Sequence, residues 1–224
     1  MISDFSIQAL LRQLPYFAHA AETTLRELEQ HAIRYTFTPD EMIFLEGEPS
    51  AGLWIVEKGR VKAYKLSTDG QEYILRFFGP GDTFNNLAAF DNAPNATSTT
   101  AVTDVSAWMI PTAVFKTMLQ TDHELALAVL QGLVSRVRHL VGQVEDLALH
   151  SVTARLAHFL LDQGEDPTLA HPAVTRALIA NHLATTPESI SRSLRALEKA
   201  GAIRFNRHQI IITQPDILRQ QAQR

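Results

Sequence analysis

The sequence predicts an α+β protein: an N-terminal β-barrel or jelly roll, then a long helix, then a C-terminal winged helix-turn-helix. Three observations carry this prediction. Short alternating apolar runs fill residues 33–110, a helical pattern continues from residue 122 to about 150, and two amphipathic helices are separated only by Thr185 and Thr186. At 224 residues and 46% hydrophobic content, the chain can bury the cores of two modest domains. The expected segments are a barrel with N-terminal helices at 1–121, a long helix and hinge at 122–150, and a winged helix-turn-helix domain at 151–224.

The barrel prediction depends on short strands separated by turn residues. Apolar residues at helical spacing first predict helices over 4–14 and 22–34. Turn signals then recur along the chain, and Asp69-Gly70 is the strongest of them for a hairpin. Short strands at this spacing are typical of a closed barrel or jelly roll. The expected strands lie at 42–45, 53–56, 61–66, 73–78, 97–102 and 106–110.

The long helix carries an apolar stripe with the 3-4 spacing of a two-stranded coiled coil. Val134 and Val141 widen this stripe, so we expect one flank to pack on the barrel while the seam meets a second copy. An ordinary core helix is the alternative. Dimerisation is favoured because a two-fold protein can read two half-sites one helical turn apart. The predicted seam consists of Leu130, Leu133, Val137, Leu140, Val144 and Leu147.

The C-terminal segment predicts a winged helix. A hinge at 149–151 precedes a helix over 152–161 and a polar loop, and two tightly joined helices follow at 175–184 and 187–198. A hairpin of 203–205 with 209–212 forms the wing, and its tip places Arg207 or His208 near a phosphate.

The second of the joined helices has a polar face suited to base edges. Glu188, Ser191 and Arg192 share one face at i, i+3 and i+4, whereas the apolar residues Ile190 and Leu194 lie behind them, with Leu197. Arginine can donate two hydrogen bonds to guanine, glutamate accepts from the cytosine amino group, and serine tolerates several bases. The pattern predicts DNA recognition; the alternative is an ordinary solvated helix face.

Composition excludes several chemistries. The chain has no cysteine, so it can form no disulfide, no thiolate nucleophile, no cysteine-ligated iron-sulfur cluster and no zinc finger. The N-terminus lacks a basic stretch followed by an apolar one, and no uninterrupted apolar run is long enough to span a bilayer. We therefore expect a cytoplasmic protein without a membrane partner.

Charge is divided unevenly along the chain. Residues 1–150 carry 11 Lys/Arg and 18 Asp/Glu, a net charge of -7, whereas residues 151–224 carry 9 and 6, a net charge of +3. Only the C-terminal segment has the sign that phosphate binding requires. DNA affinity should therefore fall with salt.

The order of these parts resembles a known family. The run GEPSAGLWIVEKGRVKAYKLSTDGQEYILRFFGPGDTFNNLAAF at 47–90 is similar to the cyclic-nucleotide-binding barrel. Followed by a long helix and a winged helix with the pattern E-x-x-S-R, it resembles the Crp/Fnr superfamily of bacterial transcription regulators over nearly the whole chain. The resemblance implies that 1–121 is a sensor domain, 122–150 a dimerisation helix and hinge, and 151–224 a DNA-binding domain. It also implies a homodimer with double-stranded DNA and RNA polymerase as partners.

The resemblance also implies which residues touch DNA. Glu188, Ser191 and Arg192 fall on the family's base-contacting positions. Pro187 replaces an arginine of the cyclic-AMP-binding branch, and this pattern resembles the Fnr-like branch and its nitric-oxide-responsive denitrification regulators. A palindrome close to TTGAT-N4-ATCAA is therefore expected. Positions that match contacts to the DNA backbone are Thr175, Arg176, Thr186, Ser189 and Arg195.

The effector positions depart from the cyclic-AMP pattern. Where the family holds the phosphate with Gly-Glu and Arg-Ser pairs, this chain aligns Asn85-Asn86 and Asn95-Ala96, and Leu140-Val141 replace a Thr-Ser pair that reaches the base. An anionic phosphate desolvated without a charged partner would cost several kcal/mol. Cyclic AMP is therefore not the expected effector.

Other effectors stay open, including none at all. The resemblance to gas-responsive regulators implies haem as one possibility, for which His19, His31, His139 and His150 are candidate ligands, but a surface or capping histidine is the favoured interpretation of each. His182 and His208 lie in the DNA-binding segment and are poorer candidates. No metal site is expected from the spacing of ligand residues.

Two alternatives come from other function classes. An enzyme would need a carboxylate pair among the acidic residues on or near strands, but no triad or metal-ligand spacing accompanies them. A cyclic-nucleotide-binding module that acts on a partner protein is disfavoured by the lost phosphate residues and the charge split. The acidic residues concerned are Glu46, Glu48, Glu57, Asp69 and Glu72.

Overall fold

The computed structural model confirms the predicted fold class and describes residues 7–91, 93–163, 175–206 and 209–223. The chain forms two compact units, one of residues 1–65 with 77–138 and the other of residues 66–76 with 139–224. The wing tip, Arg207 and His208, and most of the predicted polar loop lie outside the described residues. The division into sensor, dimerisation and DNA-binding segments stays a prediction.

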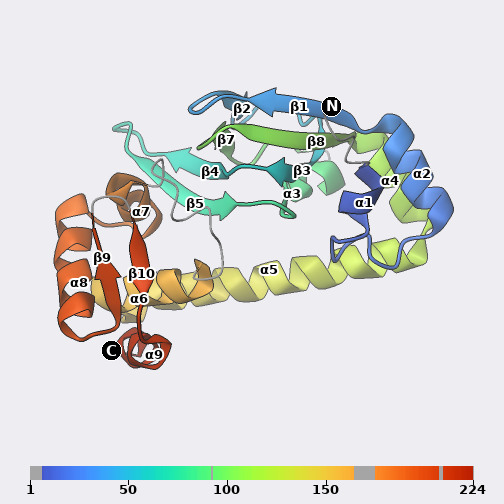
Figure 1. Ribbon diagram of the computed structural model, residues 1–224. Helices are drawn as coiled ribbons and strands as arrows, with labels where there is room; N and C mark the ends of the chain where they lie inside the picture. Colours follow the sequence, from blue (N-terminus) through green and yellow to red (C-terminus); the bar gives the residue numbers. More distant parts are fainter. Residues whose placement is uncertain (1–6, 92, 164–174, 207–208, 224) are drawn as a thin grey trace, which may run out of the picture. The chain divides into compact units, whose positions relative to one another are not determined.

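Two four-stranded antiparallel sheets form the barrel (Figure 1). One has the strand order β1-β8-β3-β6 and the other β2-β7-β4-β5. All six predicted strands are present, with ends shifted by one or two residues. The strands are β1 (Ile33–Phe37), β2 (Met42–Phe44), β3 (Gly52–Lys58), β4 (Val61–Leu66), β5 (Glu72–Phe78), β6 (Thr83–Phe84), β7 (Ser98–Ala101) and β8 (Val105–Pro111).

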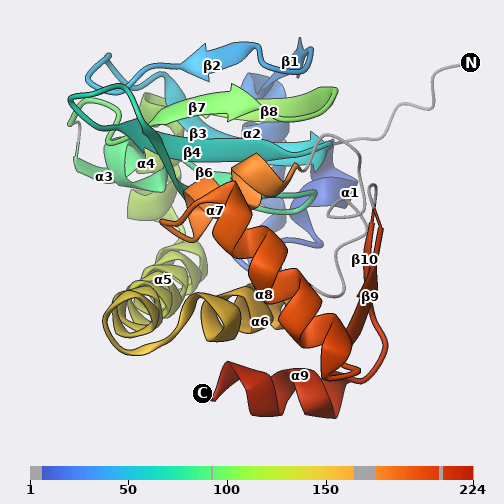
Figure 2. The same cartoon turned by 90° about the vertical axis from the view of Figure 1, so that its left-hand side faces the viewer.

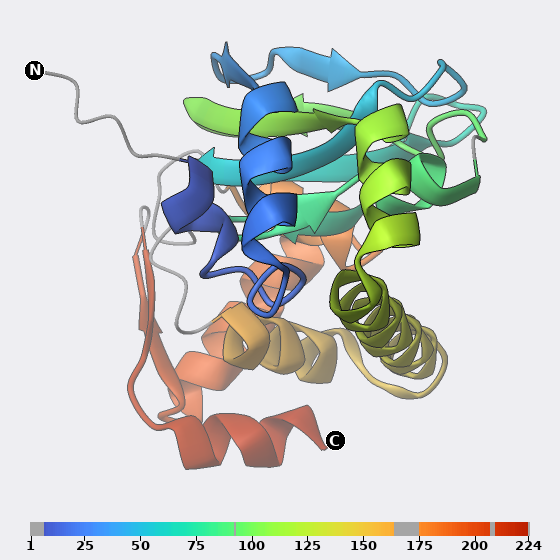
Figure 3. The ribbon, with the colours of Figure 1, turned by 90° about the vertical axis from the view of Figure 1, so that its right-hand side faces the viewer.

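Strand β3 is buried on both faces because the sheet that contains it lies between two apolar clusters. Leu53 and Ile55 point into the cluster formed with the N-terminal helices, whereas Trp54 and Val56 point into the barrel interior. The helices of this unit lie against one side of the barrel (Figure 3). They are α1 (Ile7–Leu11), α2 (Glu22–His31), α3 (Asn86–Asp91), α4 (Thr112–Thr121) and the first part of α5 (His123–Leu149).

Three elements of this unit were not predicted. The helix predicted over 22–34 ends at His31, and β1 follows it, paired with β8 from Ile33↔Met109 to Phe37↔Val105. Most of β1 is exposed, although its sequence IRYTF alternates apolar and polar residues, and the helix predicted through residue 34 overlapped the start of the strand. Strand β6 pairs through only two residues, and α3 has only six.

The two tightest predicted turns are confirmed. At Asp69-Gly70, Gly70 has a φ of 81°, and the amide of Ser67 donates to the carbonyl of Gln71 at 2.9 Å. At Lys58-Gly59, Gly59 has a φ of 88°, and a Cβ there would lie 2.1 Å from the Asp104 carbonyl oxygen. Only glycine fits the second position without moving the backbone.

Asp122 caps the N-terminus of α5 and connects it to α2. Its Oδ1 accepts from the amide of Leu125 at 3.0 Å, and its Oδ2 accepts from the amide of Ala21 at 2.9 Å and the hydroxyl of Thr24 at 2.7 Å. Burial alone would raise the pKa of Asp122, but these hydrogen bonds outweigh it and lower the pKa below its ordinary value.

One face of α5 is buried within the first unit. Leu125 and Val129 are buried, and Leu133 packs against the same cluster. At Gly132 the helix passes so close to the ring of Tyr16 that a Cβ would lie 2.0 Å from its Cε1. A glycine in the middle of a helix is unfavourable, and here close packing explains it.

The exposed stripe of α5 differs from the predicted seam. Val134 and Val141, which were expected to pack on the barrel, are 55% and 62% exposed, whereas the predicted seam residue Leu133 packs inward. The sequence prediction was wrong at these positions because Leu125, Val129 and Leu133, spaced four apart, form the inner face. The exposed apolar residues with 3-4 spacing are Leu127, Leu130, Val134, Val137, Val141 and Val144, and Leu140, Leu147 and Leu149 flank them.

Helix α5 is also the one helix among the described residues that is long and apolar enough to cross a membrane. That test considers length and composition alone and is weak support for a membrane span, since long helices of soluble proteins also meet it. Arg136 and Arg138 lie near the middle of the helix.

The second unit contains the helices and hairpin of the predicted winged helix (Figure 2). Helix α6 packs against α8 and α9, and β9 pairs with β10 through Ile211↔Arg204. Helix α9, which was not predicted, adds Leu218 and Ala222 to the core. The elements are α6 (Val152–Gln163), α7 (Arg176–His182), α8 (Pro187–Lys199), β9 (Ile203–Phe205), β10 (Ile210–Ile212) and α9 (Pro215–Ala222).

Candidate nucleic-acid interface

Threonine side chains cap both helices of the helix-turn-helix. The hydroxyl of Thr175 accepts from the amide of Leu178 at 3.3 Å, and that of Thr186 accepts from the amide of Ser189 at 3.3 Å. Pro187 occupies the first turn of α8, where its missing amide hydrogen has no intrahelical partner to lose. These caps fix where α7 and α8 begin.

The turn between the helices is short and uses a left-handed residue. The amide of Leu183 donates to the Ile179 carbonyl at 2.9 Å, and the amide of Thr185 donates to the Ala180 carbonyl at 3.0 Å. Ala184 has a φ of 47°, a region that costs an L-residue about 1–2 kcal/mol. The turn therefore occupies residues 183–186, wider than the two residues predicted.

The two faces of α8 separate as predicted. Ile190, Leu194 and Leu197 are fully buried in the core of the unit. Glu188 and Arg192 are exposed and Ser191 is partly exposed. The structure thus places the three predicted base-reading side chains on the solvent face of the N-terminal half of α8.

Hydrogen bonds within α8 hold its polar side chains. The Nη2 of Arg192 donates to the Ser189 hydroxyl at 3.0 Å. Hydrogen bonds from its own backbone amide and from the Thr186 hydroxyl lower the pKa of Glu188, and the charge of Arg192 lowers it further. Glu188 is therefore a carboxylate at neutral pH and accepts hydrogen bonds only.

Arginines surround this face. The Nη1 of Arg176 donates to the Ser191 hydroxyl at 3.5 Å, and its guanidinium lies 5.4 Å from the centre of the Phe205 ring. Arg195 is exposed on α8, one turn beyond Arg192, and Arg204 is exposed on β9. The sequence prediction missed the contact between Phe205 and Arg176, because it depends on how the hairpin folds back toward α7.

In the first unit, the residues aligned with the cyclic-AMP phosphate site bond to one another and to the backbone. The Nδ2 of Asn85 donates to the Oδ1 of Asn95 and to the Ser50 hydroxyl, each at 3.0 Å. Asn95 is buried, and its Nδ2 donates to the Leu45 carbonyl at 3.2 Å. The two amides therefore bond to each other, to a hydroxyl and to the backbone of the barrel.

The remaining effector positions do not join this group. The Nδ2 of Asn86 donates to the hydroxyl of Tyr16 at 3.1 Å, and Ala96 is exposed. Leu140 and Val141 are exposed on the part of α5 that belongs to the second unit.

The histidines raised as haem ligands lie in polar or exposed surroundings. His19 and His139 are exposed, and the Nδ1 of exposed His31 bonds to the Glu27 carbonyl at 2.8 Å. His150 bonds through its Nδ1 to Asp146.

The acidic residues weighed for catalysis are held separately by neighbours. Glu46 pairs with Lys65, Glu57 with Arg34, and Asp69 accepts from the Ser67 hydroxyl. These are ordinary surface ion pairs and turn hydrogen bonds.

Comparison with known proteins decides the family. Residues 34–122 match the cyclic nucleotide-binding domain family, and residues 154–221 match the Crp-like helix-turn-helix domain family. The chain belongs to the Crp/Fnr family of transcription regulators. Like its Crp/Fnr relatives, it is a DNA-binding regulator and not an enzyme.

Relatives cover most of this Crp/Fnr chain. It is 27% identical to the CRP-like cAMP-activated global transcriptional regulator of Mycobacterium tuberculosis, over 83% of this chain and 86% of that protein. It is 28% identical to the cAMP-activated global transcriptional regulator Vfr of Pseudomonas aeruginosa, over 80% and 88%. The structure of FixK2 from Bradyrhizobium japonicum superposes with a TM-score of 0.77 at 25% identity, covering 84% of this chain and 96% of that one.

Proposed function

We propose that this protein is a homodimeric, sequence-specific regulator that reads a palindrome close to TTGAT-N4-ATCAA. The observation that carries the proposal is the arrangement of Glu188, Ser191 and Arg192 on the solvent-facing side of the first two turns of α8. The opposite side of the helix is buried in the core of the unit. An α-helix of this kind fits the major groove, where arginine recognises guanine and glutamate recognises cytosine.

Contacts to the DNA backbone would come from the rim of this face. Thr175, Thr186 and Ser189 lie at the starts of α7 and α8, where helix N-termini favour phosphate. Arg176 and Arg195 add positive charge on either side of the reading face. Such contacts position the protein and add salt dependence, whereas the base contacts add specificity.

A second copy of the chain would cover the exposed stripe on α5. Val137 and Val144 are 60% and 65% exposed, and they recur with neighbours at coiled-coil spacing. A stripe of this length left in water is unfavourable, and pairing two copies buries it. The dimer then presents two α8 helices to the two half-sites of a palindrome.

The effector would be something other than cyclic AMP, although named relatives are cAMP-activated. Asn85 and Asn95 are neutral and already bonded to each other, so a phosphate would replace satisfied hydrogen bonds without gaining a cation. A neutral effector, or control through protein abundance alone, is compatible with these residues. Cytoplasmic location and RNA polymerase as a partner belong to the same proposal.

A gel-shift titration tests the DNA specificity. Full-length protein should retain a TTGAT-N4-ATCAA duplex at a concentration at least about 10³-fold below that needed for a scrambled duplex of the same composition. Repeating the titration at higher salt should weaken binding to both duplexes. Equal affinity for the two duplexes would disprove the proposed specificity, and an increase in affinity with cyclic AMP would disprove the effector assignment.

A further inference from the structure

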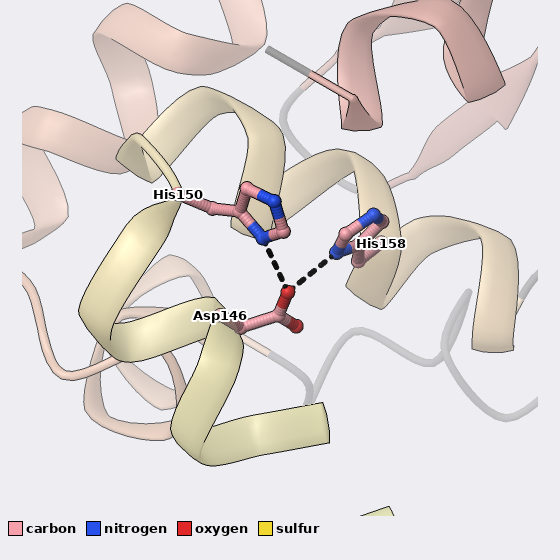
Figure 4. A group of neighbouring side chains, drawn as sticks. All are labelled: Asp146, His150 and His158. Carbon is pink, nitrogen blue, oxygen red and sulfur yellow. Dashed lines mark hydrogen bonds and ion pairs between the residues drawn. The ribbon is translucent and has the colours of Figure 1, made fainter. Parts of the chain in front are cut away.

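Two histidines and an aspartate converge where α5 meets α6. Asp146 lies in the last turn of α5, His150 is the first residue after that helix, and His158 lies on α6 (Figure 4). The Nδ1 of His150 lies 2.8 Å from the Oδ1 of Asp146, and the Nδ1 of His158 lies 2.7 Å from the same oxygen. All three side chains are partly buried, and their ligand atoms lie within 4.8 Å of one another.

We propose that Asp146, His150 and His158 form a binding site for a divalent transition-metal ion such as Zn²⁺. Two imidazoles and a carboxylate suit Zn²⁺ and its first-row neighbours, whereas Mg²⁺ and Ca²⁺ prefer all-oxygen sites. The ion would bind the two Nδ1 atoms and one carboxylate oxygen, at about 2.0–2.2 Å from each. Its remaining position stays open to water.

The three ligand atoms, the Nδ1 of His150, the Nδ1 of His158 and the Oδ1 of Asp146, already lie close together. In the metal-free protein, each imidazole reaches the single Asp146 oxygen through its Nδ1, the atom that a metal would bind. The rings of His150 and His158 lie edge to face with centres 5.2 Å apart, so they approach the oxygen from different directions. Metal binding would lengthen the two Nδ1–Oδ1 distances by roughly half an ångström, because ligands on a tetrahedral ion lie farther apart than a hydrogen bond, and each Nδ1 would have to carry no proton.

A further carboxyl group lies near the three side chains. The carboxyl of Asp162, on α6, is close enough to His158 and Asp146 to interact electrostatically with both. A carboxylate beside a ligating histidine is a common outer-shell partner of metal sites.

The site joins the two helices on either side of residues 149–151. Asp146 and His150 come from the end of α5 and its first following residue, and His158 comes from the second turn of α6. A bound ion would therefore fix the end of α5 to α6 within the second unit. This binding does not depend on the proposed DNA sequence or on an effector.

Isothermal titration calorimetry of the full-length, chelator-treated protein with Zn²⁺ tests the site. One ion per chain should bind near neutral pH, and Mg²⁺ at the same concentration should give no heat. His158→Gln and Asp146→Asn should each weaken Zn²⁺ binding by at least about tenfold. The matched control is His123→Gln, which changes an exposed histidine at the other end of α5 and should bind as the unchanged protein does.

Circular dichroism of each metal-free variant checks that the variant folds. If His158→Gln or Asp146→Asn does not fold, His150→Gln replaces it in the binding measurement. Co²⁺ provides a second readout, because its visible absorption reports the ligand set and should change in the variants but not in His123→Gln. Absence of stoichiometric Zn²⁺ binding, or equal affinity in folded His158→Gln and His123→Gln, would overturn the proposal. If the protein bound Zn²⁺ but did not prefer TTGAT duplexes, the metal site would be supported and the proposed DNA specificity would be disproved.

Discussion

The exposed face of α8 and the asparagine cluster of the barrel treat polar side chains in opposite ways. On α8, Glu188 and Arg192 keep their charges and point to solvent. In the barrel, Asn85 and Asn95 are neutral and donate to or accept from each other and the backbone. The first arrangement leaves hydrogen-bonding groups available for a ligand, whereas the second uses them for the fold. The proposed function thus combines an exposed polar face on α8 with a barrel in which two residues aligned with the family's phosphate site are hydrogen-bonded within the fold.

The largest expected effect breaks the dimer on which the reading face depends. Val137→Glu places a charge in the middle of the exposed stripe on α5, and burying that charge between two copies is unfavourable. Analytical ultracentrifugation should show monomers, and affinity for the palindrome should fall by about 10³-fold or more, to the non-specific level. Ser135→Glu, on the opposite side of the same helix, is the matched control and should remain dimeric. A dimeric Val137→Glu protein would contradict the proposed seam.

The next effect distinguishes contacts to bases from contacts to phosphates on the α8 face. Arg192→Ala should cost about 1–3 kcal/mol of discrimination at one base pair of each half-site, because it removes a bidentate contact. Arg195→Ala should instead weaken binding to all sequences alike and reduce the salt dependence by about one phosphate contact. Competition gel shifts with single-base variants of the half-site measure both. A uniform loss for Arg192→Ala would show that it contacts phosphate.

A substitution in the asparagine cluster tests its structural role. Asn95→Ala removes the acceptor of Asn85 and the donor to the Leu45 carbonyl, and unsatisfied buried groups cost about 1–3 kcal/mol. Urea unfolding should show this loss of stability with little change in DNA affinity. Ala96→Ser, at the exposed neighbouring position, should be neutral. If Asn95→Ala were as stable as the unchanged protein, the cluster would not have a structural role, and ligand binding would again be its expected function.

Acid titration compares two carboxylates whose pKa values are both lowered. Folding favours the ionised form of buried Asp122, so its contribution is complete above its ordinary pKa of 3.8 and is lost as the pH falls through its lower folded value. Unfolding followed from neutral pH into this range should therefore show a steeper acid loss in the unchanged protein than in Asp122→Asn. Glu188 has the same sign but is fully exposed, so Glu188→Gln should leave the stability profile nearly unchanged. A larger effect from Glu188→Gln would reverse this ranking.

The smallest expected effect lies in the turn that sets the angle of α8. Ala184→Gly relieves a left-handed alanine but adds freedom to the unfolded chain, and the balance is a gain of about 0.5 kcal/mol. Thermal unfolding should show a small increase in Tm with no change in the preferred DNA sequence. A loss of stability would mean that the methyl group of Ala184 contributes to packing.

A region can be predicted from the sequence when the residues that interact in it lie close together along the chain. The reading face depends on neighbours within one or two helical turns, such as Thr186 with Ser189 and Ile190 with Leu194, so periodicity and capping rules found it. Asn85 meets Ser50 across 35 residues, and Asn95 meets Leu45 across 50, so local spacing gave no signal for that cluster.

The candidate metal site illustrates the same limit at shorter range. Asp146 and His150 have helical spacing, but His158 joins them only because the chain turns between α5 and α6. The error at Leu133 has a related cause: a helix with apolar residues on two faces has two overlapping repeats, and only tertiary packing decides which one is buried.

Tyr16 connects two parts of the first unit that the proposed function treats separately. Its ring occupies the space left by Gly132 on α5, and its hydroxyl accepts from Asn86 beside the barrel. If α5 turned about its own axis at this level, a larger side chain would replace Gly132 against the ring and displace it. The rotation of α5 about its axis and the hydrogen bond of Asn86 are therefore coupled through the side chain of Tyr16.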